Sequence, residues 1–216
     1  MKITIYNKKG GAGKTPIATN IALTLGYAIA SNEDNDLAEI FPQESVIEIK
    51  HGQEFPEFPS HIDVVFDLGG VLSETSYSVL SAIKQSDLVI IPVFFDKKSI
   101  KKAIETYNEV FQFNNNIIFA VTRLKTRSGD LLKGNPKFDW AKSKDFLYIK
   151  EALQLGTGSP PTLFPLQESD FYLDMFNSGK SFEQLRDEST LQKRNIQKIV
   201  DQFSLIFNEI KKYDKA

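Results

Sequence analysis

Short apolar runs alternate along this chain with longer stretches in which apolar residues recur every three or four positions. The short runs have the length and β-branched composition of strands, and the longer stretches have the spacing of amphipathic helices. Segments predicted as strands are residues 2–6, 27–30, 46–49, 62–67, 88–93, 117–121 and 162–164. Because residues 88–93 and 117–121 are apolar almost throughout, we expect both strands to be buried on both faces of a parallel sheet.

Helices are predicted between these strands. Residues 15–25 would present Ile17, Ile21 and Leu25 on one face. A helix capped by Ser73 would carry Tyr77, Leu80 and Ile83, and the next would carry Ile100, Ala103, Ile104, Tyr107, Val110 and Phe111. Strands that alternate with helices predict an α/β fold, a three-layer sandwich around a mostly parallel sheet, formed by residues 1–216 as a single domain.

Helical signals fill the carboxy-terminal part of the chain. Residues 169–177 are predicted as a helix ended by Gly179, and Ser181 with Gln184 has the spacing of a capping box. An apolar stripe follows at helical spacing, formed by Ile196, Ile199, Val200, Phe203, Ile206, Phe207 and Ile210. We expect this stripe to face the core, and a helix lying on a membrane surface is the alternative.

Composition places the chain among ordinary globular proteins. It has 216 residues, of which 41% are hydrophobic and 25% charged, with a net charge of −2. No apolar run approaches the length of a membrane span, and the first segment reads as a strand rather than a signal peptide. The absence of cysteine excludes disulfides and thiolate metal sites, and it fits the cytoplasm, where we expect the protein to reside.

Residues 8–15 read K-K-G-G-A-G-K-T, a glycine-rich turn between a predicted strand and a predicted helix. Such a turn lets backbone N–H groups converge on phosphate oxygens, and the helix amino terminus adds positive potential. Lys14 would reach the β- and γ-phosphates, and the Thr15 hydroxyl would ligate Mg²⁺. A ligand-free turn is the alternative, but glycines, lysines and a threonine at this spacing favour nucleotide binding. The predicted loop residues are Lys9, Gly10, Gly11, Ala12, Gly13, Lys14, Thr15 and Pro16.

Carboxylates follow two of the predicted strands. Asp67 ends the strand at 62–67, precedes Gly69 and Gly70, and would support a Mg²⁺-bound water. Capping of the following helix is the alternative role for Asp67. The turn after the second strand contains Asp34 and Asp36, either of which would orient an attacking water. A solvated acidic loop is the alternative for this turn.

The segment K-G-G-A-G-K-T resembles the P-loop NTPases of the deviant Walker A type, the ATPase family of ParA, MinD and the nitrogenase iron protein. Its mark is the additional lysine, Lys9. Residues 67–70 resemble the family's Walker B and switch II segment, and residues 86–93 and 121–123 resemble two of its strand ends. Residues 171–182 resemble the closing helix-turn of short plasmid-partition ParA proteins. The small size of the chain and the absence of an amino-terminal helix-turn-helix domain point to that short subtype, close to ParF.

This resemblance implies an ATPase that binds ATP with Mg²⁺, releases ADP, and uses Lys9, Lys14, Asp34 and Asp36 in catalysis. In the family the signature lysine reaches across a nucleotide-sandwich homodimer to the partner's phosphates. The ATP-bound dimer binds nonspecific DNA, and a small centromere-binding protein of the ParB or ParG kind stimulates hydrolysis. A cytoplasmic, nucleoid-associated protein without stable membrane association is therefore expected. Arg123 and the backbone at Pro165 are candidates for contacts with the nucleotide base.

Two departures from the family pattern bear on hydrolysis. Pro16 stands where the family usually has a threonine, which removes a hydroxyl contact, although proline is tolerated in a first helical turn. Of the motif Asp-x-Asp-Pro-Gln only Asp34-x-Asp36 remains, and Asn32-x-Asp34 is a rival alignment. A nucleotide-binding switch with little hydrolysis is thus one alternative function, and a MinD-like membrane-cycling ATPase is another.

Basic residues concentrate in residues 121–150, where eight Lys or Arg stand against three Asp for a net charge of +5. Clustered cations suffice for contacts with DNA phosphates, and a solvated surface is the alternative. Residues 133–145 also resemble an insertion relative to short ParA proteins. The predicted DNA-binding residues are Lys125, Arg127, Lys133, Lys137, Lys142 and Lys144.

Overall fold

In a computed structural model of the chain, the structure describes residues 1–33, 36–50, 53–69, 76–125 and 139–214. Within these ranges one seven-stranded sheet has the order β3-β2-β4-β1-β5-β6-β7, and its paired neighbours are parallel. The strands are β1 (Lys2–Ile5), β2 (Ala28–Ser31), β3 (Val46–Glu48), β4 (Val64–Asp67), β5 (Leu88–Val93), β6 (Ile117–Leu124) and β7 (Leu163–Gln167). The predicted α/β class is confirmed, and the sheet is parallel throughout the described strands.

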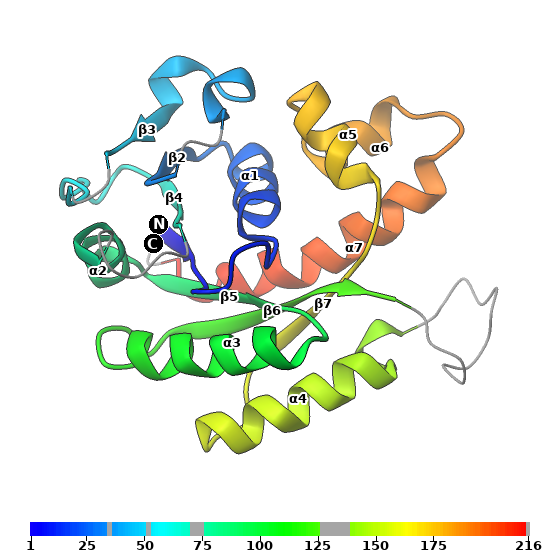
Figure 1. The fold of residues 1–216 in the computed structure, drawn as a ribbon. Helices are drawn as coiled ribbons and strands as arrows, with labels where there is room; N and C mark the ends of the chain where they lie inside the picture. Colours follow the sequence, from blue (N-terminus) through cyan, green and yellow to red (C-terminus); the bar gives the residue numbers. More distant parts are fainter. Residues whose placement is uncertain (34–35, 51–52, 70–75, 126–138, 215–216) are drawn as a thin grey trace.

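Helices cover both faces of the sheet and form the outer layers of a three-layer sandwich (Figure 1). One face is covered by α1 (Lys14–Leu25), α5 (Phe171–Ser178), α6 (Phe182–Glu188) and α7 (Lys193–Ile210). The other face is covered by α2 (Ser76–Gln85), α3 (Lys97–Val110) and α4 (Lys144–Thr157). Three short 3₁₀ helices lie in the connections, at Leu37–Glu39, Gln43–Ser45 and Trp140–Lys142.

Alternation along each strand divides the buried side chains between two cores. In β5, Leu88 and Ile90 pack in the core beneath α1 and α7, whereas Val89 and Ile91 pack in the core beneath α2, α3 and α4. Successive side chains of a strand point to opposite faces, so a strand covered on both sides must be apolar throughout. The apolar run at residues 88–93 has this cause.

One helix was not predicted from the sequence. Helix α4 begins at Lys144, inside the segment singled out for its basic charge and its likeness to an insertion. Its buried face carries Phe146, Ile149 and Leu153, which contribute to the core beneath α3. These residues follow helical spacing, so the apolar pattern indicates a helix even though basic charge is the more prominent feature of the segment. The predicted cap at Ser73 lies outside the described residues.

The carboxy-terminal stripe faces the core, as predicted. All seven of its residues are buried, and Ile199 and Ile206 are 0% exposed. They pack with α1, α6 and the sheet in one hydrophobic core.

Among the described residues, no helix is both long enough and apolar enough to span a membrane.

Truncation of Ile199 to alanine should lower the free energy of unfolding by about 2–5 kcal/mol, because a fully buried aliphatic side chain leaves a cavity. Chemical denaturation monitored by circular dichroism measures this loss. Leu205→Ala on the same helix is the matched control, since Leu205 is 48% exposed and its loss should cost about 0.5 kcal/mol. Similar losses for the two variants would contradict burial of the stripe.

Candidate nucleotide-binding site

The glycine-rich loop follows β1, the middle strand of the sheet. In the sheet β1 lies between β4 and β5, and Ile5 stands in register with Asp67 on one side and with Ile90 on the other. The strands of the sheet are parallel, so the loops after β1, β2, β4, β5 and β6 meet at the carboxyl edge of the sheet. Ligands of open parallel sheets bind at this edge. The fold therefore gathers residues far apart in sequence around the loop.

Glycine is required at two positions of the loop. Gly11 and Gly13 have φ angles of 71° and 92°, a left-handed backbone that other residues adopt at a cost. A Cβ on Gly13 would lie 3.4 Å from the Thr122 methyl group of β6. Gly13 is also the N-cap of α1, and Pro16 lies in the first turn of this helix, where its missing N–H breaks no helical hydrogen bond. The predicted strand–loop–helix geometry is confirmed.

Lys14 is the first residue of α1 and is only 6% exposed. Among the described residues no carboxylate pairs with its ammonium group, and the first turn of α1 contains no acidic residue. The helix amino terminus adds partial positive charge at the same place. A cation on a largely buried residue is unfavourable without a counter-charge, so the loop is arranged to receive an anion such as a phosphate group.

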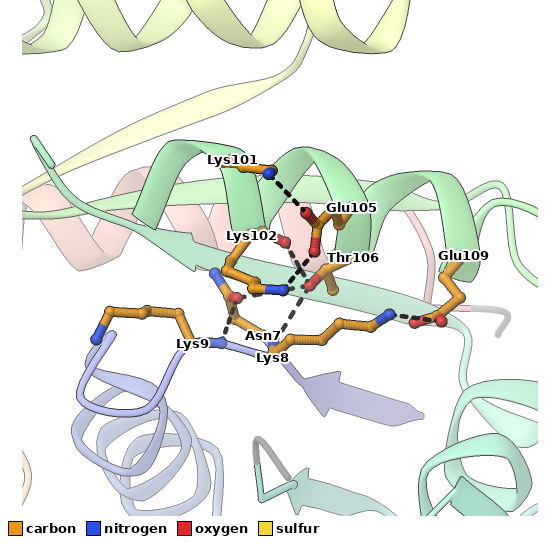
Figure 2. A network of polar contacts seen from close by, with 8 residues as sticks. All are labelled: Asn7, Lys8, Lys9, Lys101, Lys102, Glu105, Thr106 and Glu109. Carbon is orange, nitrogen blue, oxygen red and sulfur yellow. Dashed lines mark hydrogen bonds and ion pairs between the residues drawn. The ribbon is translucent and has the colours of Figure 1, made fainter. Parts of the chain in front are cut away.

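Asn7 joins the loop to β5 and α3 (Figure 2). Its amide nitrogen donates to the Pro92 carbonyl at 2.6 Å, and its amide oxygen accepts from the Lys9 backbone N–H at 2.8 Å. The Thr106 hydroxyl of α3 accepts from the Lys8 backbone N–H at 3.2 Å and donates to the Lys102 carbonyl at 2.7 Å. Asn7 and Thr106 are both 0% exposed. These bonds fix where the loop begins.

The two lysines before the glycines have different surroundings. The Lys8 ammonium pairs with the Glu109 carboxylate of α3 at 2.5 Å, and its side chain is 9% exposed (Figure 2). Burial, together with the nearby Glu109 charge, also raises the pKa of Tyr6 well above its usual range. The Lys9 ammonium contacts no carboxylate among the described residues and donates to the Gly10 carbonyl of its own loop at 2.7 Å. Lys8 is therefore held within the fold, whereas Lys9 is available for another partner.

Oxygen donors suited to Mg²⁺ lie on both sides of the loop. Thr15 is the second residue of α1, half-buried, and Asp67 is the fully buried last residue of β4. Mg²⁺ binds hydroxyl and carboxylate oxygens together with water and phosphate oxygens. Because Asp67 stands beside the end of β1, these donors fit a metal ion held at the phosphate loop.

The loop after β2 is tied to the loop after β4. The Asn32 side chain accepts from the Gly69 N–H at 2.6 Å and donates to the Ser78 hydroxyl of α2 at 2.8 Å. The Glu33 side chain lies against Gly69, where an added Cβ would come 2.6 Å from its Cγ. Asp36 is exposed, has a φ of 51° and begins the 3₁₀ helix at Leu37–Glu39. Asp34 and Gly70 lie outside the described residues.

The remaining predicted site residues are more widely distributed. Arg123, the next-to-last residue of β6, lies beside the loop. Its Nη2 atom is 3.8 Å from the position that a Cβ on Gly11 would occupy. Pro165 is buried within β7 opposite Val121. Lys125 pairs with Glu168 at 2.6 Å, Lys142 pairs with Asp139 at 3.3 Å, and Lys144 begins α4. Three predicted DNA-binding residues, Arg127, Lys133 and Lys137, lie outside the described residues.

Several residues of the site were not predicted from the sequence. Asn7, Asn32 and Thr122 are buried polar residues at or near the ends of β1, β2 and β6. Asn7 forms hydrogen bonds within its own loop and to β5, whereas Asn32 and Thr122 each form one to a neighbouring loop. Buried polar side chains need such partners. A polar residue directly after an apolar strand was the available signal, but it does not reveal which loop will be the partner. Two further residues near the loop had no such sequence signal: Thr106 lies within α3, and Phe94, whose ring lies near the Lys9 ammonium, is an apolar residue after β5.

Replacement of Asn7 by alanine should lower the free energy of unfolding by about 1–3 kcal/mol, because it leaves the Lys9 N–H and the Pro92 carbonyl without their partner. Urea denaturation measures the change. Asn115→Ala is the matched control, since Asn115 is exposed in the turn before β6. An equal effect of both substitutions would show that the Asn7 bonds do not hold the loop.

No protein-family model and no curated protein sequence matches the chain. Solved structures do match its fold. A putative plasmid partition protein from Borrelia burgdorferi B31 bound to AMPPNP has a TM-score of 0.58 and 14% identity, covering 96% of this chain and 98% of its own. An ATP complex of McdA from Cyanothece has a TM-score of 0.56 and 15% identity, covering 94% and 96%.

The cell division protein MinD from Aquifex aeolicus has a TM-score of 0.55 and 16% identity, again covering 94% of this chain and 96% of its own. At these identities the similarity concerns the fold. It confirms the architecture that the sequence resemblance implied, with strand, glycine loop and helix in the expected order. The chain therefore has the fold of the ParA and MinD P-loop ATPases.

Proposed function

We propose that this protein is a ParA-type partition ATPase that binds ATP with Mg²⁺ at residues 9–16. The observation that carries the proposal is the largely buried Lys14 residue, whose ammonium group has no carboxylate partner among the described residues and which follows a left-handed glycine loop at a helix amino terminus. Two proteins of similar fold are complexes with ATP or AMPPNP. A nucleoside triphosphate supplies the anion that this arrangement lacks.

Catalysis would depend mainly on positioning and charge neutralisation. Loop amides and Lys14 would bind the phosphates, and Thr15 with Asp67 would hold Mg²⁺, which supplies charge neutralisation when bound. A carboxylate of the turn after β2, Asp34 or Asp36, would orient the attacking water. Arg123 and Pro165 are the candidates for further nucleotide contacts.

The proposed active form is a homodimer with nucleotide between the subunits, in which Lys9 reaches the phosphates of the partner. The different surroundings of the two lysines support this assignment. Lys8 is bound to Glu109, whereas within the described part of the chain the Lys9 ammonium contacts a carbonyl of its own loop and an aromatic ring but no carboxylate. Breaking such a contact costs less than extracting a lysine from a partly buried ion pair.

The dimer is further proposed to bind nonspecific DNA on the nucleoid and to be switched by a small centromere-binding protein. The basic segment at 121–150 supports DNA binding by its charge. Burial of the α7 stripe removes the feature that favoured a MinD-like membrane cycle.

A nucleotide-binding switch with little hydrolysis is the second candidate, because Pro16 lacks the hydroxyl of the usual threonine.

Nucleotide titration and light scattering test the two loop lysines. Lys14→Ala should abolish detectable ATP binding, because it removes the charge that faces the phosphates. Lys9→Ala should retain ATP binding but lose dimerisation and phosphate release. Lys8→Ala is the control, since Lys8 is bound to Glu109; it should leave dimerisation intact. Normal dimerisation and turnover by the Lys9 variant would contradict the signature-lysine role.

Steady-state phosphate release, with and without DNA and the partner protein, separates an ATPase from a switch. Release that rises with both additions supports the ATPase. Tight ATP binding without measurable release under any of these conditions would favour the switch instead.

Charge reversal of Lys125 and Lys142 should weaken binding of the AMPPNP-loaded protein to DNA and reduce the slope of log affinity against log salt by about one for each lost phosphate contact. Fluorescence anisotropy with a random duplex measures both quantities. A matched control reverses Lys193 and Lys198, basic residues exposed at and near the start of α7, and so changes net charge equally. If both double variants lose affinity alike, only bulk charge is involved.

A further inference from the structure

Two cationic side chains meet on one aromatic ring beside the phosphate loop. The Lys9 ammonium lies 5.8 Å from the centroid of the Phe94 ring, and the Arg123 guanidinium carbon lies 5.0 Å from it. Lys9 follows β1, Phe94 follows β5 and Arg123 lies near the end of β6. These three strands are neighbours in the sheet, so the cluster arises from the order of the strands.

The backbone holds Arg123 in an unusual conformation. Its φ angle is 55°, in the left-handed region that residues other than glycine rarely adopt and that persists only where the surroundings impose it. The preceding residue, Thr122, is buried, and its hydroxyl donates to the Ala12 carbonyl of the loop at 3.0 Å. The end of β6 is thereby fastened to the phosphate loop, and Arg123 is directed to Gly11, where its Nη2 atom would contact an added Cβ at 3.8 Å.

The charges of this cluster are not balanced within the described residues. There, neither Lys9 nor Arg123 forms an ion pair with a carboxylate, and the Lys9 ammonium donates only to the Gly10 carbonyl. An aromatic ring attracts each cation but does not cancel the repulsion between them. A bound anion would do so. The planar guanidinium fork is suited to two hydrogen bonds with phosphate oxygens.

We propose that Arg123 binds the terminal phosphate of the nucleoside triphosphate held by its own chain, and that it makes the site prefer a triphosphate to a diphosphate. This inference rests on the proposed nucleotide binding. The amides at the start of α1 serve phosphates that ATP and ADP share, and Lys14 keeps its contact with the β-phosphate when ADP is bound. Arg123 approaches from the opposite end of the loop, at Gly11 and beside Lys9. When Lys9 leaves Phe94 for the partner subunit, Arg123 remains as the cation supplied in cis.

Arg123→Asn tests the proposal, because asparagine tolerates the left-handed backbone while lacking the guanidinium group. Calorimetric titration of the full chain with Mg²⁺ and either AMPPNP or ADP gives both affinities. We expect the affinity for AMPPNP to fall by about tenfold or more, as for a lost hydrogen bond to a charged group, and the affinity for ADP to change less than about twofold. Arg123→Lys, which keeps the charge without the fork, should lie between the two.

Lys212→Asn is the matched control. Lys212 is an exposed lysine just beyond the end of α7 and pairs with Glu209, so its loss should leave both affinities unchanged. An equal fall for AMPPNP and ADP in the Arg123 variants, or no fall for either, would overturn the proposal while nucleotide binding itself stands. If the unmodified chain binds neither nucleotide, the proposed function fails and this inference fails with it.

Discussion

A largely buried lysine at a helix amino terminus, Lys14, is the constraint on which the rest of this site depends. It adds its charge to that of the first α1 amides, and no carboxylate among the described residues balances the two. Such a concentration of positive charge is tolerated only where an anion can enter. The left-handed glycines, the hydrogen bonds of Asn7 and Thr106, and the central place of β1 in the sheet all hold the loop around Lys14 in a form that an anion can enter.

The loop is rigid at its base and free at one side chain. Asn7 holds the Lys9 backbone, Thr106 holds the Lys8 backbone, and Glu109 holds the Lys8 side chain. Figure 2 shows that the Thr106 and Glu109 contacts run from the loop to α3, whereas the Asn7 contact lies within the loop. The Lys9 side chain extends from this support and, like that of Lys14, has no carboxylate partner among the described residues. A backbone held in this way would let Lys9 make its proposed contact with a second subunit without disturbing the phosphate loop.

The same sheet edge brings further charge to the loop from a strand more than a hundred residues away. Thr122 binds the Ala12 carbonyl, and Arg123 shares the Phe94 ring with Lys9. By contrast, the basic residues of the segment after β6 are partly compensated, since Lys125 and Lys142 each pair with a nearby carboxylate. Charge counted along the sequence therefore overstates the charge that these two side chains offer to DNA. Among the described residues, Lys9 and Arg123 beside the phosphate loop form no ion pair with a carboxylate.

The sequence by itself determined the strands, most of the helices and the phosphate loop, because these follow from local periodicity, glycine spacing and capping residues. The positions of Gly13, Lys14 and Pro16 were set by short-range geometry alone. Only the tertiary structure decided which polar residues meet across loops, such as Asn7 with Pro92 and Asn32 with Gly69. Those partners depend on the order of strands in the sheet. Helix α4 is an intermediate case. The sequence contains its apolar spacing, but its apolar residues are buried only because α3 and β6 pack against them.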